Sequence, residues 1–258
     1  MSRPTRILQK RFVVFCEGDT EYNYINRMRK NQGVQLVLKP INMHGGGYSS
    51  FLKKIRTETS SNCLAKFIIV DADRIMSNEG ETEHFKKLYE FCCTQNKTGS
   101  IPFFLIANNP DFEYVACLHS PDYKGQDVKK YITDGLGVAN IAVFKGNSEI
   151  YNFLNQGNMS YEVMMAALQG KEKLISNKYE IKKKNFEISI SRTTYNPNMH
   201  NRKCSNMEEF FTSGTEHTGV INRVLIGHEF SGIGQESINK EDDMVESKSE
   251  NGLLFTLK

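Results

Sequence analysis

Acidic residues occur in three groups that lie far apart in the sequence, and each group follows a short apolar run. The groups are Glu17 with Glu21, Asp71 with Asp73, and Asp111 with Glu113. Five or six carboxylates held close together repel one another, which raises their pKa values and weakens a fold unless cations neutralise them. Hard divalent ions such as Mg²⁺ are bound by oxygen ligands of this kind. The pattern therefore indicates a metal-dependent site for phosphoryl transfer.

The apolar runs before these groups predict buried strands that bring the acids together. They cover residues 12–16, 67–70 and 101–107. Such runs are typical of parallel sheets that carry helices on both faces. The carboxyl ends of parallel strands meet at one edge of a sheet, where α/β proteins bind their ligands. We therefore expect all three acidic groups at that edge.

The order of strand and helix patterns predicts an α/β fold. Strands are expected from Arg11 to residue 16 and over 34–41, 67–71 and 101–107, and helices over 20–30, 48–59, 81–95 and 111–119. This alternation predicts a mostly parallel sheet of about four strands with helices on both faces.

The pattern changes beyond about residue 120. Helices are expected over 127–136, 148–155 and 160–173, whereas the stretch 187–206, rich in Ser, Thr, Asn and Arg, favours irregular structure. We place a main domain over 10–150, a helical and irregular, basic extension over 151–228, and a flexible acidic tail over 229–258.

Each acidic group also has an ordinary structural explanation. Glu21 lies where a helix would start after the turn at Gly18, and an acidic residue in a first turn meets the helix dipole favourably. Asp71 and Asp73 could belong to a solvated turn, and Asp111 suits the start of a helix. Helix starts explain the threefold recurrence of acids after strands less well than a shared site does.

Taken together, the groups resemble a known family. The motifs are Glu17-Gly18-x-x-Glu21, Asp71-x-Asp73 and Asn109-Pro110-Asp111-Phe112-Glu113, and they resemble the Toprim domain of RloB-like proteins and, more distantly, of OLD-family nucleases. The resemblance covers about residues 10–150. It implies a Toprim-like catalytic domain with a two-metal site for Mg²⁺ or Mn²⁺. By this resemblance Glu17 is the acid/base carboxylate at the metal, Glu21, Asp71 and Asp73 hold metal, Glu113 completes a second metal site, and Asp111 matches a further acidic position.

Toprim-type nucleases often add a late lysine that neutralises charge on the transferred phosphate. Lys145, which follows the apolar residues 141–144, is the preferred candidate. Lys124, Lys129 and Lys130 compete with it, and any of the four could equally be a solvated surface residue.

The resemblance implies a metal-dependent nuclease for RNA, including tRNA, or DNA, acting as an effector in a bacterial antiphage or abortive-infection system. The chain has no ATP-binding motif of its own, so an ATPase partner of the OLD or ABC-like kind is expected. Two alternatives stay open. One is a non-catalytic Toprim-fold module that binds nucleic acid or a protein partner, and the other is a haloacid-dehalogenase-type phosphatase, which would leave Glu17 and Glu113 unexplained.

A basic and aromatic stretch late in the chain is a candidate surface for nucleic acid. Its proposed phosphate contacts are Lys182, Lys183, Lys184, Arg192, Arg202 and Lys203. A solvated face explains the same charges equally well.

Composition places further bounds on the protein. The 258 residues are 39% hydrophobic, which is enough for a buried core. There is no apolar run long enough for a membrane span and no signal-peptide pattern, so we expect a cytoplasmic protein without a membrane partner. The sequence leaves a homo-oligomer open. The six cysteines form no Cys-x-x-Cys pair, which argues against a zinc ribbon.

Overall fold

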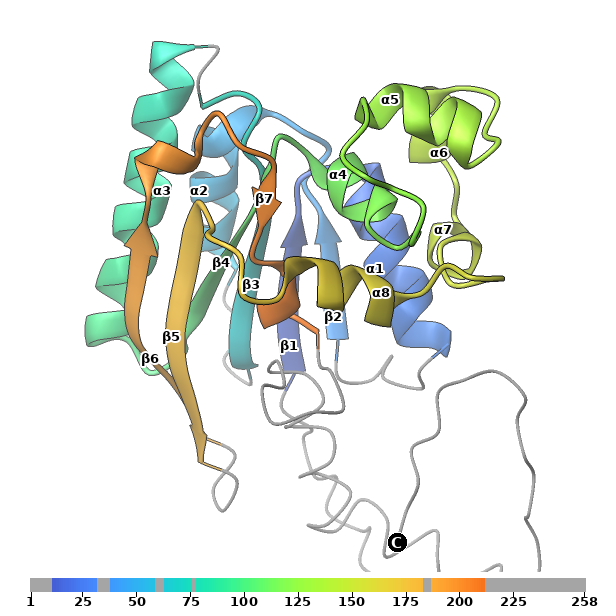
Figure 1. Cartoon of the computed structure of the whole chain (residues 1–258). Helices are drawn as coiled ribbons and strands as arrows, with labels where there is room; N and C mark the ends of the chain where they lie inside the picture. The colour runs from blue at the N-terminus through green and yellow to red at the C-terminus, as the bar shows by residue number, and fades with distance from the viewer. Residues whose placement is uncertain (1–10, 32–37, 59–62, 76–77, 183–186, 212–258) are drawn as a thin grey trace, which may run out of the picture.

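The computed structural model describes residues 11–31, 38–58, 63–75, 78–182 and 187–211 (Figure 1). The chain forms a five-stranded sheet in the order β2-β1-β3-β4-β7. The strands are β1 (Arg11–Cys16), β2 (Leu38–Asn42), β3 (Cys63–Asp71), β4 (Phe103–Asn109) and β7 (Cys204–Ser205). The first four are parallel and β7 is antiparallel to β4. The prediction of an α/β fold with a mostly parallel sheet is confirmed, and β7 is the strand that it lacked.

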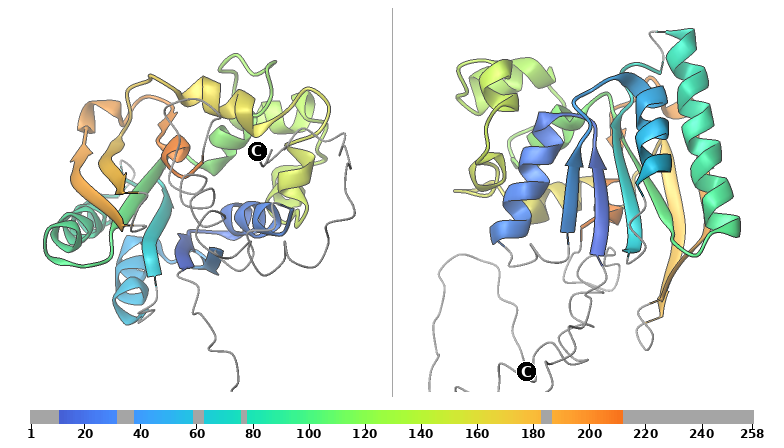
Figure 2. Two further views of the ribbon diagram at one scale, coloured as in Figure 1. Left: turned by 90° about the horizontal axis from the view of Figure 1, so that it is seen from below. Right: turned by 180° about the vertical axis from the view of Figure 1, so that it is seen from behind.

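Helices cover both faces of the sheet (Figure 2). The helices that alternate with the strands are α1 (Asp19–Asn31), α2 (Gly47–Thr57), α3 (Glu79–Thr98) and α4 (Phe112–Cys117). α1 lies on one face, whereas α2 and α3 pack side by side on the other. None of the described helices is long and apolar enough to span a membrane.

The continuous apolar runs of the strands serve two separate cores. Successive side chains of a strand point to opposite faces, so Phe12 and Val14 join the core under α1, while Val13 and Phe15 join the core under α2 and α3. β3 and β4 divide in the same way. Because both faces are buried, these strands read as unbroken apolar sequence, which is why they could be located from the sequence.

β3 begins at Cys63, four residues earlier than predicted. Lys66 interrupts the apolar run, but its side chain is only 6% exposed. Its ammonium donates to the carbonyl of Glu58 at 2.9 Å and lies over the ring of Phe103. These contacts allow a lysine inside a buried strand, and the local sequence does not reveal them.

The helices that follow α4 are α5 (Val128–Lys130), which continues as the π-helix η1 (Tyr131–Gly135), then α6 (Ile141–Lys145), α7 (Ile150–Phe153) and α8 (Tyr161–Leu168). Three of these helical segments lie in the predicted ranges but are shorter, and α6 lies between two of those ranges and was not predicted. Side chains of Asp127, Asn140 and Ser160 accept backbone N–H bonds at the starts of α5, α6 and α8. α7 packs against α1, so this segment covers the same face of the sheet as α1.

The expectation of irregular structure over 187–206 is wrong for its first half. β5 (Ile175–Lys182) and β6 (Glu187–Tyr195) form an antiparallel hairpin that packs against β4 and α3. Ile188 and Ile190 of β6 are buried and the residues between them are exposed, which is the alternation of a half-buried strand. The polar composition of the segment hid this alternation. Two single-turn helices follow, η2 (Pro197–Met199) and η3 (Met207–Glu209).

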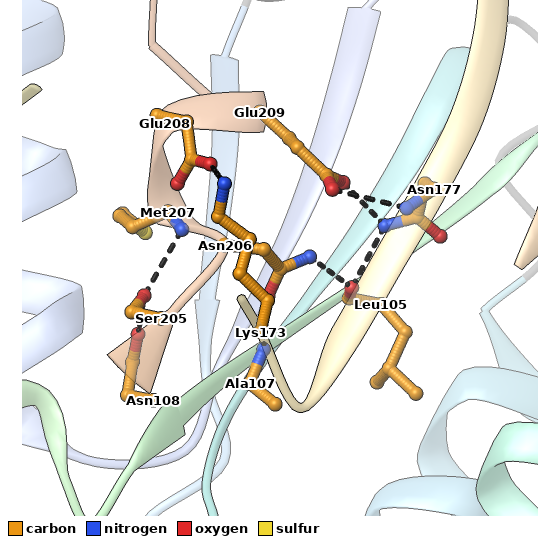
Figure 3. Close-up of polar contacts among 10 residues, drawn as sticks. All are labelled: Leu105, Ala107, Asn108, Lys173, Asn177, Ser205, Asn206, Met207, Glu208 and Glu209. Carbon is orange, nitrogen blue, oxygen red and sulfur yellow. Dashed lines mark hydrogen bonds and ion pairs between the residues drawn. The ribbon is translucent and has the colours of Figure 1, made fainter. Parts of the chain in front are cut away.

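Asparagine side chains complete the edge of β4 where the two-residue strand β7 ends (Figure 3). Asn206 donates from Nδ2 to the carbonyl of Leu105 and accepts from the amide of Ala107, both at 2.9 Å. Asn177 donates to the same Leu105 carbonyl at 2.9 Å. Because β7 is only two residues long, these side chains supply the hydrogen bonds to the backbone of β4 that a longer strand would supply. Buried backbone groups need such partners. The C-terminal extension is thereby fixed to β4.

Two partly buried glutamates, Glu208 and Glu209, lie beside this edge (Figure 3). Glu209 accepts from the backbone amide of Asn177 at 3.0 Å and from its side-chain amide at 2.5 Å. Glu208 forms an ion pair with Lys173. Burial raises the pKa of Glu209 to about 8. The predicted divisions at residues 150 and 228 stay predictions, and the acidic tail 229–258 lies outside the described residues.

Replacing Asn206 should destabilise the fold measurably. Asn206→Ala leaves the buried amide of Ala107 without its acceptor and removes one of two donors to Leu105. We expect the free energy of unfolding to fall by about 1–3 kcal/mol in urea denaturation. Asn198→Ala, at an exposed position of η2, is the matched control and should stay within about 0.5 kcal/mol of wild type. Equal stabilities of the two variants would contradict this account of the edge.

Candidate active site

The carboxyl ends of β1, β3 and β4 bring the predicted acids to one cleft. β1 pairs with β3 and β3 pairs with β4 in parallel, so the residues that follow each strand leave the sheet at the same edge. The cleft has a volume of about 210 Å³. Its lining includes predicted residues from all three groups and the preferred lysine, namely Glu17, Glu21, Asp71, Asp73, Glu113 and Lys145.

Glu17 directly follows β1 and is 7% exposed. Its Oε2 accepts from the backbone amide of Asp71 at 2.8 Å, which ties the end of β1 to the end of β3. Burial raises the pKa of Glu17 to about 7, against the lowering effects of this hydrogen bond and of the charge of Arg74. Glu17 therefore changes protonation near neutral pH.

Glu21 lies in the first turn of α1 and is 2% exposed. Its Oε2 accepts from the amide of Gly18 at 3.3 Å, as a glutamate in a helix-capping arrangement does. Its Oε1 has no partner among the described residues. Burial, with the nearby charges of Glu113 and Glu17, raises the pKa of Glu21 to about 8. The capping hydrogen bond thus accounts for Oε2 of Glu21 and leaves Oε1 available to a ligand in the cleft.

Asp71 ends β3, and one of its oxygens is buried without support. Oδ1 has no hydrogen-bond partner in the described part of the chain. Burial, followed by the charges of Glu21 and Glu17, raises the pKa of Asp71 well above its usual range. Asp73, two residues later, is exposed at the mouth of the same cleft. Of the two aspartates, Asp71 is therefore the one with a buried oxygen that lacks a described partner, whereas Asp73 is exposed.

Glu113 enters the cleft from the first turn of α4 and is 2% exposed. Its Oε1 accepts from Oγ1 of Thr20 at 3.1 Å and lies 3.3 Å from Nζ of Lys145. Its Oε2 has no partner within the described ranges. Burial disfavours the charged lysine, but the carboxylate of Glu113 outweighs it and raises the pKa of Lys145. These contacts connect α1, α4 and α6 at the site.

Asp111 lies beside the cleft and not in its lining. It is the N-cap of α4, and its Oδ1 accepts from the amide of Tyr114 at 3.1 Å. Burial and the charge of Glu113 raise the pKa of Asp111 to about 6. Asp111 therefore makes the hydrogen bond of an ordinary N-cap, while the charge of Glu113 in the cleft acts on its carboxyl group.

The loop that leads into α2 adds backbone groups to the site. His44, Gly45, Gly46 and Gly47 all have positive φ, from 56° to 98°. The amide of Gly45 donates to the carbonyl of Glu17 at 2.8 Å, and Gly45 lines the cleft. A Cβ on Gly47 would lie 2.8 Å from the carboxylate of Glu81, which also accepts from the amide of Tyr48. The carboxylate of Glu81 can move at the end of its flexible side chain, so it is chiefly the φ of 72° at Gly47 that favours glycine here.

Three further residues near the cleft were missed. Asp19 and Arg74 line it, and Glu81 supports the glycine loop from α3. Asp19 and Arg74 stand beside predicted residues in the sequence, so their closeness was a usable signal. Glu81 lies in an ordinary acidic first turn of a helix, and only the packing of α3 on α2 reveals its role.

The donor set of the cleft fits a divalent cation. Three buried carboxylate oxygens, one each from Glu21, Asp71 and Glu113, have no hydrogen-bond donor among the residues that the structure describes. Carboxylate oxygens are the ligands that Mg²⁺ and Mn²⁺ prefer. Over the described ranges, no group of three or more His, Cys, Asp or Glu side chains is spaced to hold a metal ion. The fit therefore rests on the chemistry of the donors and on their unpartnered oxygens.

Three of the predicted nucleic-acid contacts, Arg192, Arg202 and Lys203, have side chains that the structure describes. Arg192 lines a groove between α3 and β6, and Arg202 pairs with Glu172 at 3.7 Å. Nζ of Lys203 donates to the hydroxyl of Tyr123 and to two backbone carbonyls, so this lysine holds a loop. The side chain of Lys182, together with Lys183 and Lys184, lies outside the described residues.

The chain matches no protein-family model, and comparisons with curated proteins and with solved structures find no similar protein.

Proposed function

We propose that the chain is a metal-dependent nuclease that hydrolyses phosphodiester bonds with a Toprim-like α/β domain. The observation that carries this proposal is a set of three carboxylates in one cleft beside a lysine, Glu21, Asp71 and Glu113, each with a buried oxygen that has no hydrogen-bond partner among the described residues. Buried carboxylates without partners destabilise a fold, so a function that uses them accounts for their presence.

Each residue has a role that its surroundings support. When bound, divalent ions supply an activated water and charge stabilisation for the leaving oxygen. Glu21, Asp71, Asp73 and Glu113 would hold the ions. Glu17, with its pKa raised to about 7 and one oxygen fixed by the amide of Asp71, suits proton transfer near neutral pH.

Lys145 and the glycine loop would handle the phosphate. The half-exposed ammonium of Lys145 points at the carboxylates and can bind a phosphate oxygen placed between them. The positive-φ residues 44–47 form the kind of backbone that presents amides to an anion, and Gly45 reaches the cleft. The cleft therefore offers carboxylates for divalent ions, and an ammonium and backbone amides for the phosphate.

The wider biological role follows from the resemblance of the three acidic motifs to RloB-like Toprim domains. It comprises action in the cytoplasm as an effector of antiphage defence or abortive infection, with an ATPase partner of the OLD or ABC-like kind. RNA, including tRNA, and DNA are both candidate substrates. The haloacid-dehalogenase alternative gains no support, because that chemistry has no use for the buried Glu17 and Glu113 that share the cleft with Asp71 and Asp73.

Cleavage assays with a matched variant pair test the proposal. Labelled single- and double-stranded DNA, total tRNA and messenger RNA would be incubated with wild type, with Mg²⁺, Mn²⁺ or EDTA, and with or without a co-expressed ATPase. We expect one substrate class to be cut only with metal, and Glu21→Gln to cut at least about 100-fold more slowly. Glu83→Gln, which removes an exposed carboxylate of α3, should cut like wild type. Binding of nucleic acid without cleavage, unchanged in EDTA and in Glu21→Gln, would favour the non-catalytic module.

A further inference from the structure

The contacts of Lys145 suggest more than a phosphate-binding role. Its Nζ lies 3.3 Å from Oε1 of Glu113, the oxygen that also accepts from Thr20. Half of the lysine side chain is exposed, whereas the carboxylate side chain is 3% exposed. The ammonium therefore reaches down from solvent onto a buried anion whose other oxygen has no described partner.

Charge in the cleft is strongly unbalanced. Its described lining carries six carboxylates, Glu17, Asp19, Glu21, Asp71, Asp73 and Glu113, against the two basic side chains Arg74 and Lys145. Arg74 acts electrostatically on Glu17, while Lys145 is paired with Glu113. Removing a cation that is paired with a buried carboxylate is strongly destabilising. Lys145 therefore stabilises the ionised form of Glu113.

We propose that Lys145 is the internal counter-ion of Glu113, and that a divalent ion must displace it to bind there. This inference rests on the proposed function, because it assumes that the cleft takes metal. A lysine on a flexible four-carbon stem, half in solvent, is suited to such an exchange. The exchange lowers the affinity of the cleft for metal and frees the ammonium for phosphate at the moment when the ion arrives.

Calorimetric titration of Mn²⁺ into the full chain tests this exchange. Lys145→Met keeps most of the side-chain stem and removes the competing charge, so it should bind Mn²⁺ about three- to tenfold more tightly than wild type. Lys129→Met makes the same change in net charge at an exposed position of α5 and should bind within about twofold of wild type. Without metal, Lys145→Met should melt at a lower temperature than wild type, and Mn²⁺ should remove that difference.

The outcomes separate this inference from the proposed function. Unchanged or weaker Mn²⁺ binding by Lys145→Met, with normal binding by wild type, would overturn the exchange alone. Tightening of equal size in Lys129→Met would also overturn it, because the effect would then come from net charge. A wild type that binds no Mn²⁺ would remove both the exchange and the nuclease proposal.

Discussion

Replacing Asp71 with asparagine is expected to abolish metal-dependent cleavage and, at the same time, to stabilise the metal-free protein. Asp71 Oδ1 is buried without a partner among the described residues, and burial, followed by the charges of neighbouring carboxylates, raises the pKa of Asp71 well above its usual range. Asp71→Asn keeps the shape of the side chain and removes its charge. Above neutral pH we expect the free energy of unfolding without metal to rise by about 1–3 kcal/mol. Cleavage should slow by more than about 100-fold, because a ligand oxygen is lost.

Urea denaturation in EDTA and cleavage rates in Mn²⁺ measure the two effects. Asp122→Asn, a change of the same type at an exposed position, should leave both within experimental scatter. Addition of Mn²⁺ should stabilise wild type more than Asp71→Asn. A variant that is less stable than wild type in EDTA, and that still cleaves, would show that Asp71 is a structural residue. Opposite effects on stability and activity are the signature of a side chain kept for function.

Stability of the metal-free protein should fall as pH rises. The pKa is raised to about 7 in Glu17 and to about 8 in Glu21, mainly by burial. The folded state therefore holds protons that the unfolded state has already released. The stabilisation by these protons is complete below about pH 4.5, the usual range for glutamate, and is lost as pH rises through the folded pKa values. Between about pH 5 and pH 8.5 the loss should exceed about 2 kcal/mol.

Metal should reverse this dependence, since a divalent ion binds the ionised carboxylates. We expect Mn²⁺ to raise the melting temperature much more at about pH 8.5 than at about pH 5. Burial also raises the pKa of Glu209 to about 8, but Glu209 contacts Asn177 and does not line the cleft. Glu209→Gln should therefore weaken the pH dependence and leave the response to Mn²⁺ intact. Stability that increases with pH in EDTA would refute the assignment of these protons.

The elements that could be predicted from the sequence are those whose signal lies in a run of adjacent residues. β1 and β4 are buried on both faces and read as apolar runs, so their ends and the acids that follow them could be located. β6 could not be located in this way, because its buried isoleucines alternate with serines in a polar segment. The choice of Lys145 over Lys129 and Lys130 rests on the apolar residues 141–144 before it, which form most of helix α6. Only the packing of α6 near α1 and α4 brings Lys145 to Glu113.

The edge of β4 has a consequence for the order in which the chain folds. Asn206 contacts Leu105 and Ala107 across about a hundred residues of sequence. During synthesis β4 is complete long before the segment that closes its edge has left the ribosome. Until then β4 presents unpaired backbone groups, which invite pairing with other chains. Slower translation of residues 110–206, or reduced access of chaperones during that time, should therefore lower the yield of folded protein.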